Sequence, residues 1–206
     1  MSTRLRITQH EDILLFTLES DDGFPRLERR ILSEMKTRIT DVAENRELAG
    51  TVITGTELAF ATGAEITELA ELTLSEAFEF ARYGQSVMQA IAGSPKPVVA
   101  AIRGYCMGGG LDLALACYAR IASVDSVFAH PGGSLGIITG WGGTQRLPRL
   151  IGRARALGIF VTGLRLSANE AHEWGLVTRI TPANAAISEA IREVRTMSSR
   201  SRSSRE

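Results

Sequence analysis

Apolar residues recur along this chain in two alternating patterns, one typical of strands and one typical of helices. Short apolar runs predict strands at residues 5–8, 13–18, 51–54, 98–102, 120–124, 127–129 and 176–180. After the second run, apolar side chains recur at helical spacing and predict a long amphipathic helix from Pro25: Leu27, Ile31, Met35, Ile39 and Val42. Strands alternating with helices predict an α/β layered fold with a largely parallel sheet.

Capping residues and glycines set the expected ends of the other elements. Thr73 with Glu76, and Ser167 with Glu170, form two possible capping boxes, the first opening a helix that runs to about Ala92. Further helices are expected at 140–151 and 154–162 and from Thr181 onward, with a flexible glycine loop around residues 132–136. Residues 198–206 are almost all Ser and Arg, so we expect a disordered tail after a single domain at 1–197.

Charge, apolar run length and cysteine spacing argue against several classes of protein. Among 206 residues the formal net charge is zero, whereas a nucleic-acid binder that relies on electrostatics is normally basic. No apolar run reaches the ~18 residues of a membrane span, and no secretory leader precedes the first strand. Cys106 and Cys117 lack metal-ligand spacing and are expected to be free thiols. We therefore expect a cytoplasmic protein without metal, membrane or nucleic acid.

Three consecutive glycines, Gly108 to Gly110, separate a strand-like run from the helix-like run 111–117. A helix that begins after such a turn leaves backbone N–H groups free to bind negative charge. One interpretation is therefore half of an oxyanion hole, and the other is close packing of a helix against a strand. Residues 60–65, Phe-Ala-Thr-Gly-Ala-Glu, form a second glycine turn after a strand.

These two turns, together with Gly142-Gly143-Thr144-Gln145-Arg146-Leu147 and residues 168–177, resemble the signatures of the crotonase (enoyl-CoA hydratase/isomerase) family in the family's order. The resemblance implies a crotonase-like fold of stacked β-β-α turns and an acyl-CoA thioester as ligand. It implies that the N–H groups of Ala64 and Gly109 hold the thioester oxygen, with Glu65, Ile66 and Thr67 also at the substrate. It implies no cofactor apart from the coenzyme A of the substrate, and a homo-oligomer, trimeric or hexameric.

The acid–base residues depart from the family pattern. Hydratases of this family use two glutamates, and the matching positions here are Asp112 and Gly132. Asp112 is either the catalytic acid or base, or an acidic residue that favours the helix dipole. His130, two residues before Gly132, either replaces the missing acid or is a structural histidine. Adding water to a double bond needs a base and an acid, so the halved pair argues against efficient hydration.

Other departures concern coenzyme A and the acyl pocket. Thr67 stands where the family often carries a basic residue, and residues 20–27 lack the usual basic loop, which leaves arginines such as Arg26, Arg29 and Arg30 for the phosphates. Tyr105 and Trp141 either line the acyl pocket or belong to the core. The C-terminal helical region is short for the family.

The resemblance therefore implies an acyl-CoA enzyme of fatty acid metabolism that stabilises a thioester enolate. Isomerisation, decarboxylation and thioester hydrolysis fit one proton carrier better than hydration does. The alternative is an acyl-CoA-binding or assembly protein of the same fold that has lost its chemistry.

Overall fold

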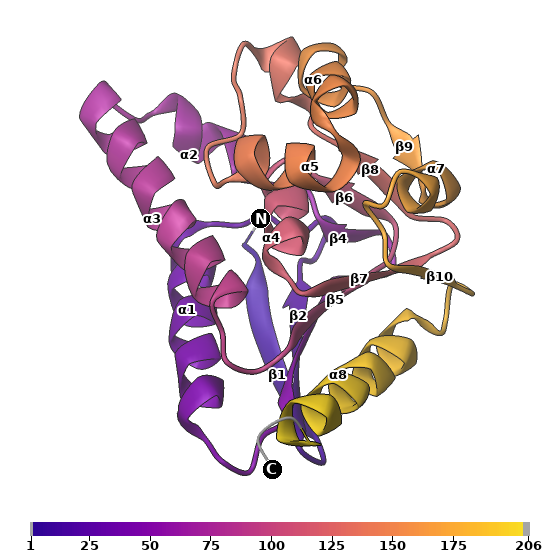
Figure 1. Ribbon diagram of the computed structural model, residues 1–206. Coiled ribbons are helices and arrows are strands. Elements are labelled where there is room, and N and C mark those ends of the chain that lie inside the picture. Colours follow the sequence, from indigo (N-terminus) through magenta and orange to yellow (C-terminus); the bar gives the residue numbers. More distant parts are fainter. Residues whose placement is uncertain (1, 204–206) are drawn as a thin grey trace.

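The computed structural model describes residues 2–203, with burial and side-chain contacts as far as residue 199. Its strands form two sheets (Figure 1). The larger sheet contains, in spatial order, β1 (Arg4–His10), β2 (Ile13–Glu19), β3 (Gly50–Thr54), β5 (Val98–Ile102), β7 (Ala119–Ser123) and β10 (Arg179–Thr181). The smaller contains β4 (Ala59–Ala61), β6 (Tyr105–Met107), β8 (Val127–Ala129) and β9 (Leu166–Ser167).

Successive strands in the middle of the chain alternate between the two sheets. β3, β5 and β7 lie next to one another in the larger sheet, and β4, β6 and β8 lie in the same order in the smaller sheet. All of these neighbours pair in parallel, and only the pairs β1–β2 and β8–β9 are antiparallel among the described strands. Each β-β step is thus one turn of a superhelix, which confirms the expected stacked β-β-α fold.

Helices cover both faces of the larger sheet. α1 (Arg29–Glu44) and α3 (Leu74–Ala92) lie side by side over one face, and α8 (Ala186–Ser203) packs across β3, β5 and β7 on the other (Figure 1). The remaining helical elements are α2 (Ile66–Ala70), α4 (Gly109–Ala116), the 3-10 helix η1 (Pro131–Leu135), α5 (Gly143–Ile151), α6 (Arg153–Thr162) and α7 (Ala168–Glu173). The main core lies on the α1–α3 side and a smaller core lies under α8.

Both capping boxes are present, at Thr73–Glu76 and Ser167–Glu170, so these helix starts are confirmed. Several other boundaries were wrong. The first long helix begins at Arg29 because the backbone of residues 25–27 pairs with the loop after β4. The last strand begins at Arg179 and its helix at Ala186, and the expected glycine loop contains η1.

The C-terminal tail was also predicted wrongly in part. Residues 198–203 continue α8, because an apolar stripe that includes Ala186, Ala190 and Val194 anchors the helix on the sheet and the helix extends beyond it. Residues 204–206 of the expected disordered tail lie outside the described residues.

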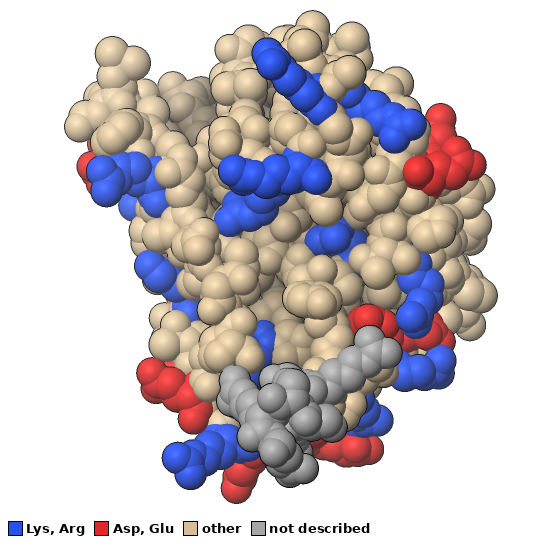
Figure 2. Space-filling view, in the orientation of Figure 1, with Lys and Arg blue, Asp and Glu red and all other residues tan. Residues whose placement is uncertain are grey.

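Two features of the described residues bear on membrane and nucleic-acid binding. None of the described helices combines the length and the apolar character needed to cross a bilayer. On the face in Figure 2, the described basic side chains are scattered among uncharged and acidic ones. Nucleic-acid binding typically gathers Lys and Arg into one patch, and the absence of such binding stays a prediction.

α4 lies unusually close to the smaller sheet. A Cβ atom at Gly110 would lie 2.2 Å from the carbonyl oxygen of Ala61 in β4. Because that atom belongs to the backbone of a paired strand, it has little freedom to move away. Glycine at this position therefore lets the N-terminus of α4 sit directly beside the end of β4.

We predict that Gly110→Ala destabilises the fold by about 1–3 kcal/mol, the usual range for an overpacked core. The matched control is Gly158→Ala in α6, where a Cβ meets no atom within 4 Å, and where alanine should stabilise the helix by up to ~1 kcal/mol. Urea denaturation of both variants measures the effect. Equal free energies of unfolding in the two variants would contradict the close approach of α4 to β4 at Gly110.

Candidate active site

Three loops meet at one edge of the smaller sheet, because the parallel strands β4, β6 and β8 all end there. The loop after β4 carries Ala64, the turn after β6 carries Gly109, and the segment after β8 carries His130. All three residues line a cavity of about 340 Å³. The topology thus brings together three residues of which the first and last, Ala64 and His130, are 66 positions apart in the sequence (130 − 64).

Gly63 and Gly108 shape the two loops that carry the predicted oxyanion donors. Their φ angles are +108° and +53°, a region that favours glycine. A Cβ at Gly63 would lie 3.1 Å from the backbone nitrogen of Gly109, so the two loops touch. Gly109 begins α4, and within the described residues neither its N–H nor that of Ala64 has a hydrogen-bond partner. Two adjacent free donors at a helix N-terminus are suited to binding an oxyanion.

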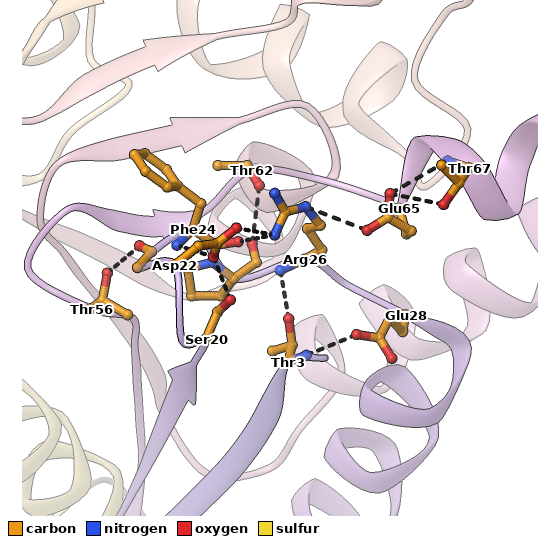
Figure 3. A network of polar contacts seen from close by, with 12 residues as sticks. Thr3, Ser20, Asp22, Phe24, Arg26, Glu28, Thr56, Thr62, Glu65 and Thr67 are labelled. Atoms are coloured by element: carbon orange, nitrogen blue, oxygen red, sulfur yellow. Dashed lines mark hydrogen bonds and ion pairs between the residues drawn. The ribbon is translucent and has the colours of Figure 1, made fainter. Parts of the chain in front are cut away.

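A polar network braces the loop that carries Ala64 (Figure 3). The N–H of Thr62 donates to the carbonyl of Pro25 at 2.9 Å, and the N–H of Leu27 donates to the carbonyl of Gly63 at 2.8 Å. Arg26 lies 2.8 Å from Asp22 and 3.4 Å from Glu65, which caps α2. Backbone and side-chain contacts from residues 22–27 therefore fix the chain on both sides of Ala64.

Asp112 lies in the first turn of α4 and is fully buried. Its Oδ2 atom accepts hydrogen bonds from the hydroxyl of Thr139 and, at 3.3 Å, from the N–H of Trp141. Thr139, Trp141 and His130 line the cavity, whereas Asp112 does not. The carboxyl group thus lies behind the residues that line the cavity and is in contact with three of them.

His130 is the neighbour of Asp112 that faces the cavity. Its side chain is 4% exposed, its ring centroid lies 5.1 Å from that of Phe160, and its Nε2 lies 3.4 Å from Oδ1 of Asp112. Neither Nε2 nor Oδ1 has a hydrogen-bond partner among the described residues. Because a proton on either atom would let one donate to the other, the two groups are placed to share one proton.

Burial shifts the pKa values of the two groups in opposite directions. Loss of hydration raises the pKa of Asp112 to about 6, although its bonds to Thr139 and Trp141 lower it. Loss of hydration lowers the pKa of His130 to about 4. At neutral pH the carboxylate is therefore ionised and the imidazole is neutral.

Gly132 has no room for a side chain. A Cβ there would lie 2.8 Å from the carbonyl oxygen of Ile137, whose N–H in turn donates to the carbonyl of Gly132 at 3.0 Å. The segment at 137 thus occupies the space beside Gly132.

The other predicted site residues divide between two cavities. Ala64, Ile66 and Gly109 line the apolar cavity, while Glu65 and Thr67 line a more open neighbour. Tyr105, considered for the acyl pocket, lies elsewhere, 6.3 Å from Phe24 between ring centroids. The apolar wall consists mainly of residues that the sequence did not single out: Leu69, Leu72, Ala77, Phe80, Ala81, Leu135, Ile137, Ile138 and Phe160.

The more open cavity, which Glu65 and Thr67 line, also contains candidate phosphate ligands. Arg29 and Arg30 line it at the start of α1, together with three acidic residues, Glu28, Glu65 and Glu68. The Arg29 guanidinium lies over Phe80 and Tyr83, while Arg30 donates to the carbonyl of Thr3. No group of three metal-ligating side chains was found among the described residues.

The opposed pKa shifts predict opposite effects on stability. Between about pH 4 and 6 the folded protein keeps a proton on Asp112 that the unfolded chain has released. The contribution of Asp112 to the free energy of unfolding therefore falls as the pH rises. Between about pH 4 and 6.5 the unfolded chain protonates His130 and the folded protein does not, so its contribution rises with pH.

Asp112→Asn keeps the histidine but removes the carboxyl group. We therefore expect its free energy of unfolding, relative to that of wild type, to increase by roughly 3 kcal/mol as the pH rises from about 4 to 7. For His130→Gln, which keeps the carboxyl group, the free energy of unfolding relative to wild type should decrease by a similar amount over the same pH range. Urea denaturation at several pH values gives both differences, and titrations common to all three proteins cancel. Parallel pH profiles would show that the two pKa values are not shifted.

Comparison with known proteins agrees with this geometry. Residues 8–205 match the family model for enoyl-CoA hydratase/isomerase. The chain is 34% identical over 200 residues to "Probable enoyl-CoA hydratase echA8" of Mycobacterium tuberculosis, covering 96% of this chain and 76% of that protein. It superimposes on the crystal structure of enoyl-CoA hydratase from Bacillus anthracis with a TM-score of 0.89 and 33% identity, covering 95% and 76% of the two chains.

A second solved structure gives the same result. Enoyl-CoA hydratase from Thermoplasma volcanium superimposes with a TM-score of 0.86 and 33% identity, over 92% of this chain and 76% of that one. Shared fold, shared sequence and the matched family model together show that this chain belongs to the enoyl-CoA hydratase/isomerase family of enzymes.

Proposed function

We propose that this protein binds an acyl-CoA thioester and moves one proton along its acyl chain, so that double-bond isomerisation, rather than hydration, is its reaction. One observation carries the proposal. The cavity has two free N–H donors and a single proton-carrying unit, Asp112 with His130, and no acidic residue lies among its described lining residues.

The two backbone donors would stabilise the charged intermediate. When a proton leaves the carbon beside a thioester, the negative charge moves onto the thioester oxygen. The N–H groups of Ala64 and Gly109 line the cavity and lack partners, so they are available to that oxygen. Removing one such donor typically costs about 2.7–4 kcal/mol of barrier.

The proton would move through His130. At neutral pH the neutral imidazole takes a proton from C2 of a 3-enoyl thioester, and the electron pair passes to the thioester oxygen. The imidazolium then returns the proton to C4, the electrons return from the oxygen, and the double bond moves from C3–C4 to C2–C3. Asp112, ionised above about pH 6, would stabilise the imidazolium. Atoms and charge balance without water or an oxidant.

Hydration would require a base for the attacking water and an acid for C2, two roles that a single proton-carrying unit would have to fill. The family's second glutamate position is Gly132, and the carbonyl of Ile137 occupies the space beside it. This packing argues against a carboxyl group from elsewhere in the described chain reaching the same place.

The alternative is an acyl-CoA-binding or assembly protein without turnover. It is favoured by the same observation, since the cavity and both donors are kept while the second carboxyl is missing. Decarboxylation and thioester hydrolysis are further reactions that one proton carrier would serve. A cytoplasmic location and a trimeric or hexameric homo-oligomer stay predictions.

Proton exchange tests the proposed chemistry without knowledge of the natural acyl group. Wild-type protein in deuterated water should exchange the C2 protons of butyryl-CoA, detected by mass spectrometry, and should convert a 3-enoyl-CoA to the conjugated isomer. His130→Gln should slow both by about 10²–10⁴-fold, the usual contribution of a general acid or base. Crotonyl-CoA should not be hydrated at a comparable rate.

The matched control is His172→Gln, because His172 contacts the carbonyl of Val177 and does not line the cavity. Exchange that is equally fast in His130→Gln would refute the proton route. Binding of acyl-CoA without exchange would favour the alternative, and efficient hydration of crotonyl-CoA would refute the preference for isomerisation.

Arg29 and Arg30 are expected to contact the phosphates of coenzyme A. We predict that replacing both by Gln raises the Kd for butyryl-CoA about tenfold or more, the value of a lost charge-assisted hydrogen bond. Arg38→Gln is the control, because Arg38 lies on the same helix but pairs with Asp41. Calorimetry at two salt concentrations measures the effect, and an unchanged Kd in the double variant would place the phosphates elsewhere.

A further inference from the structure

The indole of Trp141 is held between two helices at positions where both carry glycine. A Cβ at Gly84 in α3 would lie 2.1 Å from Cδ1 and Nε1 of the indole, and one at Gly109 in α4 would lie 2.4 Å from its Cζ3 atom. Trp141 is 4% exposed, and its ring centroid lies 5.5 Å from that of Phe80. The five-membered side of the ring thus lies on α3 and the six-membered side lies on α4.

Along α3, the apolar cavity stops at the indole. Ala77, Phe80 and Ala81 line the cavity from one face of α3, and Gly84 is the next position on that face. Gly84 does not line the cavity, because Trp141 covers it. Without the indole, the cavity would continue along α3 by about one helical turn.

We infer that Trp141 determines acyl-chain length, and that the substrate is a short-chain acyl-CoA. The inference rests on the proposed function, in which the thioester oxygen lies at the N–H of Gly109. The six-membered ring of Trp141 lies against the α-carbon of that same residue. An acyl chain that starts there and follows the wall formed by α3 meets the indole, and methylenes beyond that point lose contact with α3.

The side chain and the backbone of Trp141 act separately. Its N–H donates to Oδ2 of Asp112 at 3.3 Å, whereas its ring contacts Gly84, Gly109 and Phe80. Substituting the side chain therefore keeps the backbone donor to Asp112. This separation lets the test change chain-length preference without removing the acid–base pair.

The test measures the Kd of saturated acyl-CoAs, which bind without needing the reaction. Wild-type protein should bind butyryl-CoA, and its affinity for octanoyl- or dodecanoyl-CoA should be no higher. Trp141→Ala should gain affinity with each longer chain, about fourfold for each methylene newly buried. Trp141→Leu, which leaves a smaller gap and protects folding, should show the same trend to a lesser extent.

The control is Trp174→Leu, because Trp174 packs against Arg155 and does not line the cavity, and its profile should match wild type. An unchanged profile in both Trp141 variants, with wild-type protein binding butyryl-CoA, would overturn the inference and leave the proposed function standing. Tighter binding of dodecanoyl-CoA than of butyryl-CoA by wild type would overturn it as well. Failure of wild type to bind any acyl-CoA would overturn both.

Discussion

The site depends on the close approach of two stretches of backbone, the one that ends β4 and the one that ends β6. Gly110 lies against the carbonyl of Ala61, and Gly63 lies against the nitrogen of Gly109. Any side chain at Gly110 would push α4 away from β4 and separate the two N–H donors. The paired parallel strands make this approach possible, because β4 and β6 end at the same edge and their loops leave in the same direction. Residues 25–27 then fix the Ala64 loop from outside.

A second constraint is the scarcity of charge inside the site. Burial favours the neutral forms of both groups: it raises the pKa of Asp112 from about 4 to about 6 and lowers that of His130 from about 6.5 to about 4. One proton shared between them satisfies two buried atoms that otherwise lack partners. In the proposed reaction the neutral imidazole takes up a proton from the substrate, and the ionised carboxylate beside it stabilises the positive charge that results.

Much of the fold was predictable from local signals. Helical periodicity located α1, two capping boxes gave the starts of α3 and α7, and the resemblance of the two glycine turns to family signatures pointed to Ala64 and Gly109. β6 was missed because its three residues lie between Gly104 and Gly108, in a stretch whose glycines indicate a turn rather than a strand. The contact between Thr139 and Asp112 was equally hidden, because the two residues are 27 positions apart and only the folded chain brings them together. The apolar wall formed by α2, α3 and η1 likewise follows from packing, not from any motif.

The segment from residue 137 to residue 141 contacts Gly132 and Asp112 and lines the apolar cavity. Ile137 fills the space beside Gly132, Thr139 and the backbone of Trp141 hold Asp112, and the Trp141 ring closes the cavity against α3 and α4. A glutamate at position 132 would collide with the carbonyl of Ile137, and moving that carbonyl would disturb the residues that hold Asp112 only two positions later. Gly132, the buried Asp112 and the indole of Trp141 are therefore parts of one packed arrangement, and a side chain at position 132 would require the whole segment 137–141 to shift.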